Sequence, residues 1–375
     1  MKKDSNELLK EKVEMIDDIL TLAQRLIAIP STVNLPPEKK KILAIVEELL
    51  QEFTIDSFNH EDIHSLLIHN AKPGTKKFKI ILNAHLDVVA ARSEQFKPFI
   101  KDGKLFGRGA YDMKTAAAVM IFLFKDIASQ LGYPIALQLS TDEENGGYRG
   151  VGHQIHKGVR ADFVITGECG SNFRIIHQAK GILRTRLIAQ GKTSHSAYPW
   201  RGENAIVKLH HAIHAILSEY PLPKEEIYRT TVNVTHVHTN NTSINTITPD
   251  HCEAILDIRF IPGERQAVID TVKSALPEGV RYEVIYDSTP HKTDVDNKYI
   301  KILATTAKEI LKQKIVFGKA HGASDMRHFT EVNCDGVEFG PIGGNQHHDN
   351  EWVDIKSLGD YYQILKQFLL AVNAK

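Results

Sequence analysis

The sequence has few of the features that mark secreted, membrane-spanning or nucleic-acid-binding proteins. Its 375 residues include only three cysteines, which are widely spaced and form no CxxC pair, so no disulfide framework is expected. The longest apolar run, residues 116–124, is too short to cross a bilayer, and the charged N-terminus lacks the apolar stretch of a signal peptide. Basic and acidic residues balance at 46 each, so no net positive charge attracts nucleic acid or anionic lipid. We therefore expect a cytoplasmic protein with neither nucleic-acid nor membrane partners.

Two different orders of predicted helices and strands divide the chain. Residues 1–179 and 289–375 alternate apolar strands with amphipathic helices, which is typical of an α/β fold with a mixed, largely parallel sheet and helices on both faces. Residues 180–288 instead follow the order strand, helix, strand, strand, helix, strand, which is the split-βαβ order of a ferredoxin-like α+β domain. With 42% hydrophobic residues the chain can form two cores, so we predict that residues 180–288 are a domain inserted in the sheet domain.

Three acid-rich clusters follow predicted strands of the sheet domain. They are NAHLD at 83–87, GRGAYDMK at 107–114 and STDEENGG at 140–147. Alone, an HxD pair is usually a polar strand end, and an acidic triplet is usually a solvated turn. Ligands in sheets of this kind gather at the carboxyl ends of the strands, so the coincidence of three clusters favours a metal site.

Two further segments supply enough ligands for two ions. Glu168 follows the predicted strand 161–166, and GGNQHHDNEWV at 343–353 follows another short strand. Two imidazoles and three or four carboxylates can hold a pair of zinc ions that share one carboxylate and one water. Side chains alternate along a strand, so Asp87 points the same way as His85 and can orient its ring.

The five segments NAHLDVV, GRGAYDMK, STDEENGG, Gly167-Glu168 and HHDNE resemble the two-zinc amidohydrolase and carboxypeptidase family. Its members include acetylornithine deacetylase, succinyl-diaminopimelate desuccinylase, aminoacylase and glutamate carboxypeptidase. The segments occur in the same order over nearly the whole chain. The resemblance implies two Zn²⁺ ions per chain, for which Co²⁺ or Mn²⁺ can substitute. This chain departs from the family in having Cys169 where proline is usual and Thr115 where glycine is usual.

The resemblance also implies a role for each residue of the centre. The implied metal ligands are His85 and Glu168 for one ion, Glu144 and His347 for the other, and Asp112 between the two. Glu143 is the implied general base, and Asp87 the residue that orients His85. His347 is chosen over His348 because the family's last ligand lies four residues before a glutamate, here Glu351.

The inserted domain resembles the lid domain of the family, which in many members also forms the dimer contact. His195, in GKTSHSAYPWRGENAI, matches the histidine that polarises the scissile carbonyl, and the family favours its action on the neighbouring chain; otherwise it is a surface residue of a loop. Arg259, in LDIRF, matches a substrate-binding arginine and is otherwise an ordinary sheet-edge residue. Asn245 lies in a segment one residue longer than the family's Asn-x-x-Pro. Arg327, in HGASDMRHF, either contacts substrate or closes a helix.

The leading hypothesis is a zinc-dependent hydrolase that cleaves the amide bond of a small N-acyl amino acid, using metal-bound hydroxide with Glu143 as base. A metallocarboxypeptidase or dipeptidase could use the same site on a short peptide, because the pocket walls and not the ligands select the substrate. Glu168 favours a deacylase, since the tripeptidase and aminopeptidase branches tend to have aspartate there, and so does the SDMR loop at 324–327. A non-catalytic binding protein is a third alternative. The presence of all five implied metal ligands and of the base Glu143 argues against it. We expect a homodimer formed through the lid.

Overall fold

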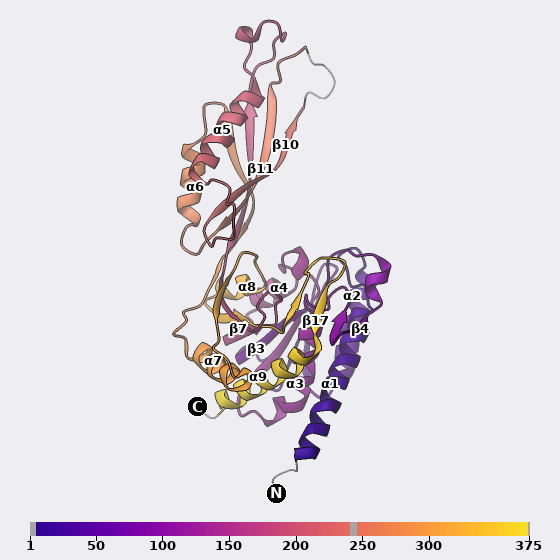
Figure 1. Ribbon diagram of the computed structural model, residues 1–375. Helices are drawn as coiled ribbons and strands as arrows, with labels where there is room; N and C mark the ends of the chain where they lie inside the picture. Colours follow the sequence, from indigo (N-terminus) through magenta and orange to yellow (C-terminus); the bar gives the residue numbers. More distant parts are fainter. Residues whose placement is uncertain (1–4, 241–245, 374–375) are drawn as a thin grey trace. The chain divides into compact units, whose positions relative to one another are not determined.

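The computed structural model describes residues 5–240 and 246–373 (Figure 1). The chain separates into two compact units, each considered by itself. The first, the sheet unit, consists of the described parts of Met1–His177, Lys292–Gly318 and Ser324–Lys375; the second, the insert, consists of those of Gln178–His291 and Lys319–Ala323. The sequence analysis placed residues 319–323 in the sheet domain. They group with the insert in this division, and the side chains of Lys319 and His321 lie against the ring of Tyr228.

The sheet unit contains a nine-stranded mixed sheet with the order β1-β2-β6-β3-β7-β15-β8-β13, in which β14 pairs with β8. The strands are β1 (Thr54–His60), β2 (Ile63–His69), β3 (Lys77–His85), β6 (Ile135–Ser140), β7 (Arg160–Thr166), β8 (Ile175–Ala179), β13 (His291–Lys292), β14 (Phe317–Ala320) and β15 (Asp335–Glu338). Four neighbouring strands, β6, β3, β7 and β15, run parallel. Antiparallel strands flank them. The predicted mixed, largely parallel sheet is confirmed at its centre.

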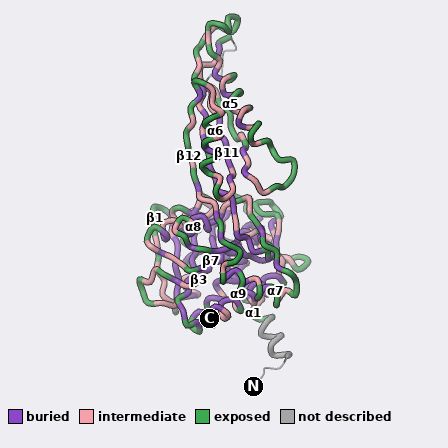
Figure 2. Tube along the Cα trace, turned by 90° about the vertical axis from the view of Figure 1, so that its left-hand side faces the viewer, coloured by how far each residue is buried: buried purple, intermediate pink, exposed green. Residues whose placement is uncertain are grey.

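Helices cover both faces of this sheet, as Figure 1 shows. The helices are α1 (Ser5–Ile27), α2 (Pro36–Leu49), α3 (Lys114–Ile127), α4 (Val151–His156), α7 (Lys298–Leu311), α8 (Met326–Thr330) and α9 (Ile355–Asn373). Successive side chains of β3 enter different cores: Ile80 belongs to the core shared with α1, α2, α3, α7 and α9, whereas Ile81 belongs to the core shared with α4 and α8. Because both faces are covered, β6 is buried along its whole length, and β3, β7 and β15 are buried toward their carboxyl ends (Figure 2).

The parallel strands bring the acid-rich segments to one edge of the sheet. His85 is the last residue of β3, β6 ends at Ser140 just before the acidic triplet, and β7 ends at Thr166 two residues before Glu168. These strands are adjacent and point in one direction, so their carboxyl ends meet. The order of strands therefore positions the candidate ligands.

A second, small sheet was not predicted from the sequence. It has the order β16-β17-β5-β4, formed by β4 (Phe99–Lys101), β5 (Lys104–Phe106), β16 (Gly343–Gly344) and β17 (Trp352–Asp354). Asp102 and Gly103, both with positive φ, form the tight turn between β4 and β5. The pairing of Phe106 with Trp352 holds the glycine-rich segment 107–112 beside the HHDNE segment.

The insert has the predicted ferredoxin-like arrangement. Its elements are β9 (Gly181–Gln190), α5 (Ala205–Glu219), β10 (Thr231–Thr239), β11 (His251–Phe260), α6 (Arg265–Ser274) and β12 (Val280–Ser288). The sheet order is β10-β11-β9-β12 with every pair antiparallel. Alternate residues of β11, such as Leu256 and Ile258, are buried and pack with Leu209 of α5 and Val272 of α6. Within the described residues of the chain, no helix combines the length and hydropathy needed to span a membrane.

Candidate metal centre

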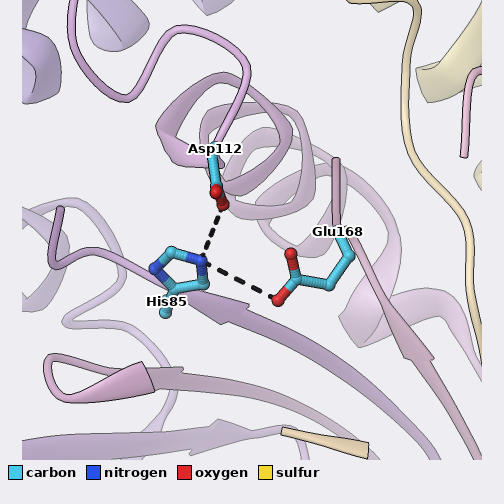
Figure 3. A group of neighbouring side chains, drawn as sticks. All are labelled: His85, Asp112 and Glu168. Carbon is cyan, nitrogen blue, oxygen red and sulfur yellow. Dashed lines mark hydrogen bonds and ion pairs between the residues drawn. The ribbon is translucent and has the colours of Figure 1, made fainter. Parts of the chain in front are cut away.

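His85 lies at the centre of the first group of candidate ligands. Its side chain is buried, and its Nδ1 lies 3.0 Å from the backbone oxygen of Asp87. Its Nε2 faces two carboxylates, at 3.1 Å from Asp112 Oδ1 and 3.8 Å from Glu168 Oε1 (Figure 3). The imidazole thus has one nitrogen occupied by the backbone and the other directed at two acids, as a ligand to a metal ion requires.

A second group shares Asp112 with the first. His347 Nε2 lies 3.1 Å from Asp112 Oδ2 and 3.2 Å from Glu144 Oε1. Asp112 therefore directs one carboxylate oxygen to each histidine. The side chain of His347 is 43% exposed, whereas those of Asp112 and Glu144 are nearly buried, so the second group faces solvent at His347. His348 is exposed and lies in neither group of ligands found among the described residues.

The composition and electrostatics of both groups fit divalent cations. In each group the candidate ligand atoms all lie within 4.8 Å of one another. Glu168 Oε1 is buried and accepts no hydrogen bond from the described residues. Burial and the neighbouring carboxylates of Asp112 and Glu143 raise the pKa of Glu168 well above its usual range. Buried carboxylates in such numbers are stabilised when cations lie among them, and a mixture of imidazole and carboxylate suits zinc, cobalt or manganese.

Asp87 connects the two sides of the site. Its Oδ1 and Oδ2 accept hydrogen bonds from the backbone nitrogens of Glu143, at 3.2 Å, and Glu144, at 3.0 Å. Its Oδ1 lies 3.5 Å from His85 Nδ1, whereas its backbone oxygen lies 3.0 Å from the same nitrogen. The backbone of Asp87 makes the shorter contact with the His85 ring, and its carboxylate fixes the short helical turn at Glu143–Asn145.

Glu143 is buried beside the ligands and interacts with α8. Its Oε1 accepts a hydrogen bond from Arg327 Nη2 at 3.1 Å, and Arg327 is itself only 4% exposed. Burial raises the pKa of Glu143 well above its usual range, although His85 and Arg327 oppose this effect. From the same helix, His328 Nε2 bonds to the backbone oxygen of Gly146 at 2.9 Å. Helix α8 thus contacts both ends of the turn that carries Glu143 and Glu144.

Three residues that the sequence analysis did not select also hold the site together. Glu351 accepts hydrogen bonds from the backbone nitrogen of Asp112, at 2.9 Å, and from Arg108 Nη1, at 2.6 Å. Arg108 Nη2 donates to the backbone oxygen of His347 at 3.1 Å. Gln346 Nε2 donates to Asp112 Oδ2 at 2.8 Å. The sequence signals for them were their positions inside the GRGAYDMK and GGNQHHDNEWV segments and, for Glu351, its place four residues after His347.

The remaining predicted site residues belong to the insert, which is described by itself, or to undescribed positions. His195 is an exposed loop residue of the insert, and its Nδ1 accepts a hydrogen bond from the backbone nitrogen of Ala197 at 3.0 Å. Arg259, on β11, is paired with Asp257 through Nε at 2.6 Å. Asn245 lies outside the described residues.

The chain is similar to known proteins in both sequence and fold. The sequence pattern of the peptidase family M20/M25/M40 matches residues 81–371. Succinyl-diaminopimelate desuccinylase of Blochmanniella floridana is 28% identical over 395 aligned positions, which cover 95% of this chain and 100% of that protein. Among solved structures, aminopeptidase PepT of Bacillus cereus has a TM-score of 0.79 at 18% identity, covering 96% of this chain and 99% of that one. The M20 family metallo-carboxypeptidase Sso-CP2 of Sulfolobus solfataricus has a TM-score of 0.76 at 19% identity, covering 96% and 100%. These two likenesses concern the fold, whereas the sequence match extends over most of the chain and all the clustered ligands. The chain belongs to the peptidase family M20/M25/M40 and is a metal-dependent hydrolase.

Proposed function

We propose that this protein removes the acyl group from a small N-acyl amino acid by hydrolysing its amide bond. The observation that carries the proposal is the pair of ligand groups joined through Asp112, with Glu143 buried at their side. His85 and Glu168 would hold one Zn²⁺ ion, Glu144 and His347 the other, and Asp112 both. When bound, the ions polarise the amide carbonyl and lower the pKa of a coordinated water to about 7.

Glu143 is the group that moves the proton. It takes a proton from the attacking water and passes it to the leaving nitrogen, so the amine departs neutral. Asp87 supports this role by fixing the backbone of Glu143 and Glu144 through two hydrogen bonds. Arg327 holds the carboxylate of Glu143 in place, and its planar guanidinium could also bind a substrate carboxylate that comes close to the base.

The insert supplies the remaining groups in this proposal. His195 would donate a hydrogen bond to the oxyanion that develops on the carbonyl oxygen. Arg259 and Asn245 would bind the polar ends of the substrate, and Arg259 is already held in a fixed orientation by Asp257. We further propose that the insert acts as a lid and as the contact of a homodimer, so that His195 serves the partner chain.

The choice of a deacylase over a peptidase rests on side chains around the centre and on the relatives. Glu168 and the SDMR loop support a deacylase, and the curated relatives reported above include a succinyl-diaminopimelate desuccinylase. A carboxypeptidase or dipeptidase would use the same ligands and base. The two are distinguished by substrate and not by the chemistry at the carbonyl.

The test is a substrate screen with the purified, zinc-loaded protein. N-succinyl amino acids, N-acetyl amino acids and dipeptides are compared at equal concentration, and the free amine released is measured. We expect release from an N-acyl amino acid at a rate at least tenfold above that from any dipeptide, and loss of release in Glu143→Gln. Preferential cleavage of dipeptides would support the peptidase alternative, and release unaffected by Glu143→Gln would refute the proposed site.

A further inference from the structure

Helix α5 of the insert carries two histidines on its solvent-facing side. Residues Ala205, Leu209, Ala212 and Ile216 form the buried stripe of this helix. His210 and His214 lie outside that stripe and are exposed. They are four positions apart in the sequence, so they lie one above the other on the same face of the helix.

The two rings are already close and nearly parallel. Their centroids are 6.2 Å apart and their planes are inclined by 21°. A tetrahedral ion with nitrogens at 2.0–2.1 Å needs two imidazole nitrogens about 3.3 Å apart. Both rings are exposed, and rotations about their side-chain bonds can bring the ring nitrogens from the observed arrangement to this separation.

The ring nitrogens of both residues are available. Among the residues that the structure describes, neither ring makes a hydrogen bond or an ion pair; their contacts are between aromatic rings. The nearby cation of α5, Lys208, is directed elsewhere, toward Glu203 and the backbone oxygen of Gln190. A solvated polar face would account for exposed histidines, but two free imidazoles at this spacing also form a bidentate chelate.

We propose that His210 and His214 bind one transition-metal ion per chain, of the type Cu²⁺, Ni²⁺ or Zn²⁺, at a site separate from the buried centre. Imidazole is a preferred ligand of these ions, and histidines four apart on a helix are a known zinc-binding arrangement. Two protein ligands leave the other coordination positions to water. The surface site is therefore weaker than the buried centre and does not depend on the proposed function.

Neighbouring His211 provides a matched control. It is also exposed, and its ring centroid lies 6.0 Å from that of His210, but it is the adjacent residue and the two ring planes are inclined by 52°. Adjacent residues of a helix point in different directions, so His211 and His210 do not form a chelate. Replacing His211 removes one exposed histidine from the same helix and leaves the proposed pair intact.

The experiment is a Cu²⁺ titration of the full-length protein whose centre has first been filled with zinc and freed of excess metal. Copper binding is followed by electron paramagnetic resonance, and zinc content is measured in the same samples. We expect one Cu²⁺ per chain in a two-nitrogen environment with no loss of zinc. His210→Ala and His214→Ala should each weaken this binding at least tenfold, whereas His211→Ala should leave it unchanged.

Three results would overturn the proposal. Copper could bind His210→Ala and His214→Ala as tightly as it binds the unaltered protein, it could bind only by displacing an equal amount of zinc, or it could be lost in His211→Ala. Circular dichroism melting curves of each variant establish that the insert remains folded. Because all three substitutions are on the exposed face of α5, no change in melting is expected.

Discussion

Replacing Glu351 by glutamine is expected to weaken the metal centre, although this side chain belongs to neither ligand group. Glu351 is 1% exposed and accepts four hydrogen bonds. One oxygen receives Arg108 Nη1 at 2.6 Å and the backbone nitrogen of Gly109 at 3.1 Å. The other receives the backbone nitrogens of Tyr111 at 2.8 Å and Asp112 at 2.9 Å. The carboxylate thereby fixes the loop that ends in the shared ligand.

The expected magnitude follows from these four bonds. Glutamine keeps one acceptor oxygen and turns an NH₂ group toward the other two donors, so two buried donors lose their partner. Each such loss costs about 1–3 kcal/mol, which predicts a destabilisation of about 2–6 kcal/mol. Asp112 would lose the support of its loop, and His347 would lose part of its own through Arg108. Residues that orient ligands typically change metal affinity by about 10–100-fold, and we expect a loss in this range.

The assay has two parts and a matched control. Zinc affinity is measured by competition with a chromophoric chelator, and the free energy of unfolding by urea titration of metal-free protein. Glu338→Gln is the control: Glu338 is also buried, but within the described residues its side chain accepts one hydrogen bond, from Ser324 Oγ at 2.5 Å, and burial raises its pKa to about 7. A carboxyl group that is partly protonated near neutral pH resembles glutamine, so we expect a change below about 1 kcal/mol. Equal effects of the two substitutions on both measurements would refute the role assigned to Glu351.

Three further predictions concern the pair Glu143 and Glu144, the buried His328, and His195 of the insert. Glu143→Gln should keep both metals and lower turnover roughly 100-fold or more, whereas Glu144→Gln should lose metal; equal metal loss by elemental analysis would mean that the two roles are reversed. Burial lowers the pKa of His328 to about 3, so its neutral form contributes stability above pH 6.5 that is lost as the pH falls toward 3. Between pH 7 and pH 5, the free energy of unfolding from urea titrations should therefore fall by about 2 kcal/mol more in the unaltered protein than in His328→Gln. Glutamine does not titrate but can still donate a hydrogen bond to the backbone oxygen of Gly146. Equal falls in the two proteins would contradict this prediction. If His195 acts on the partner chain, a mixture of His195→Ala and Glu143→Gln proteins should recover about a quarter of normal activity after subunit exchange, and an inactive mixture would exclude that arrangement.

The parts of the site that could be predicted lie directly after long, apolar strands. The segments ending in His85, Ser140 and Thr166 are β3, β6 and β7, whose interiors are buried on both faces. Such strands are recognisable as continuous apolar runs, and their parallel pairing fixes where their ends meet. The sequence alone therefore predicts that the polar residues at their ends share one site, and the structure brings them together.

The supporting pairs could not be predicted in the same way. Arg108 and Glu351 are separated by 243 positions and meet because β5 pairs with β17. Those strands have three residues each, too few for an alternating pattern to be distinguished from a loop. Burial of a charged pair also has no signature in composition, since arginine and glutamate are usually exposed. Such contacts require the tertiary structure.

The choice between His347 and His348 shows why backbone conformation limits prediction at a single position. His347 has φ +62° and Asn345 has φ +60°, in the left-handed region that non-glycine residues rarely adopt. Asparagine and histidine are enriched among the few non-glycine residues found there, so the sequence of this segment does not fix which of its residues adopt it. Arg108 holds the backbone oxygen of His347, and the side chain of Asn345 donates to the backbone oxygen of Asn350 at 3.0 Å. In the loop that these two bonds hold, the ring of His347 lies against Asp112 and Glu144, while His348 remains at the surface.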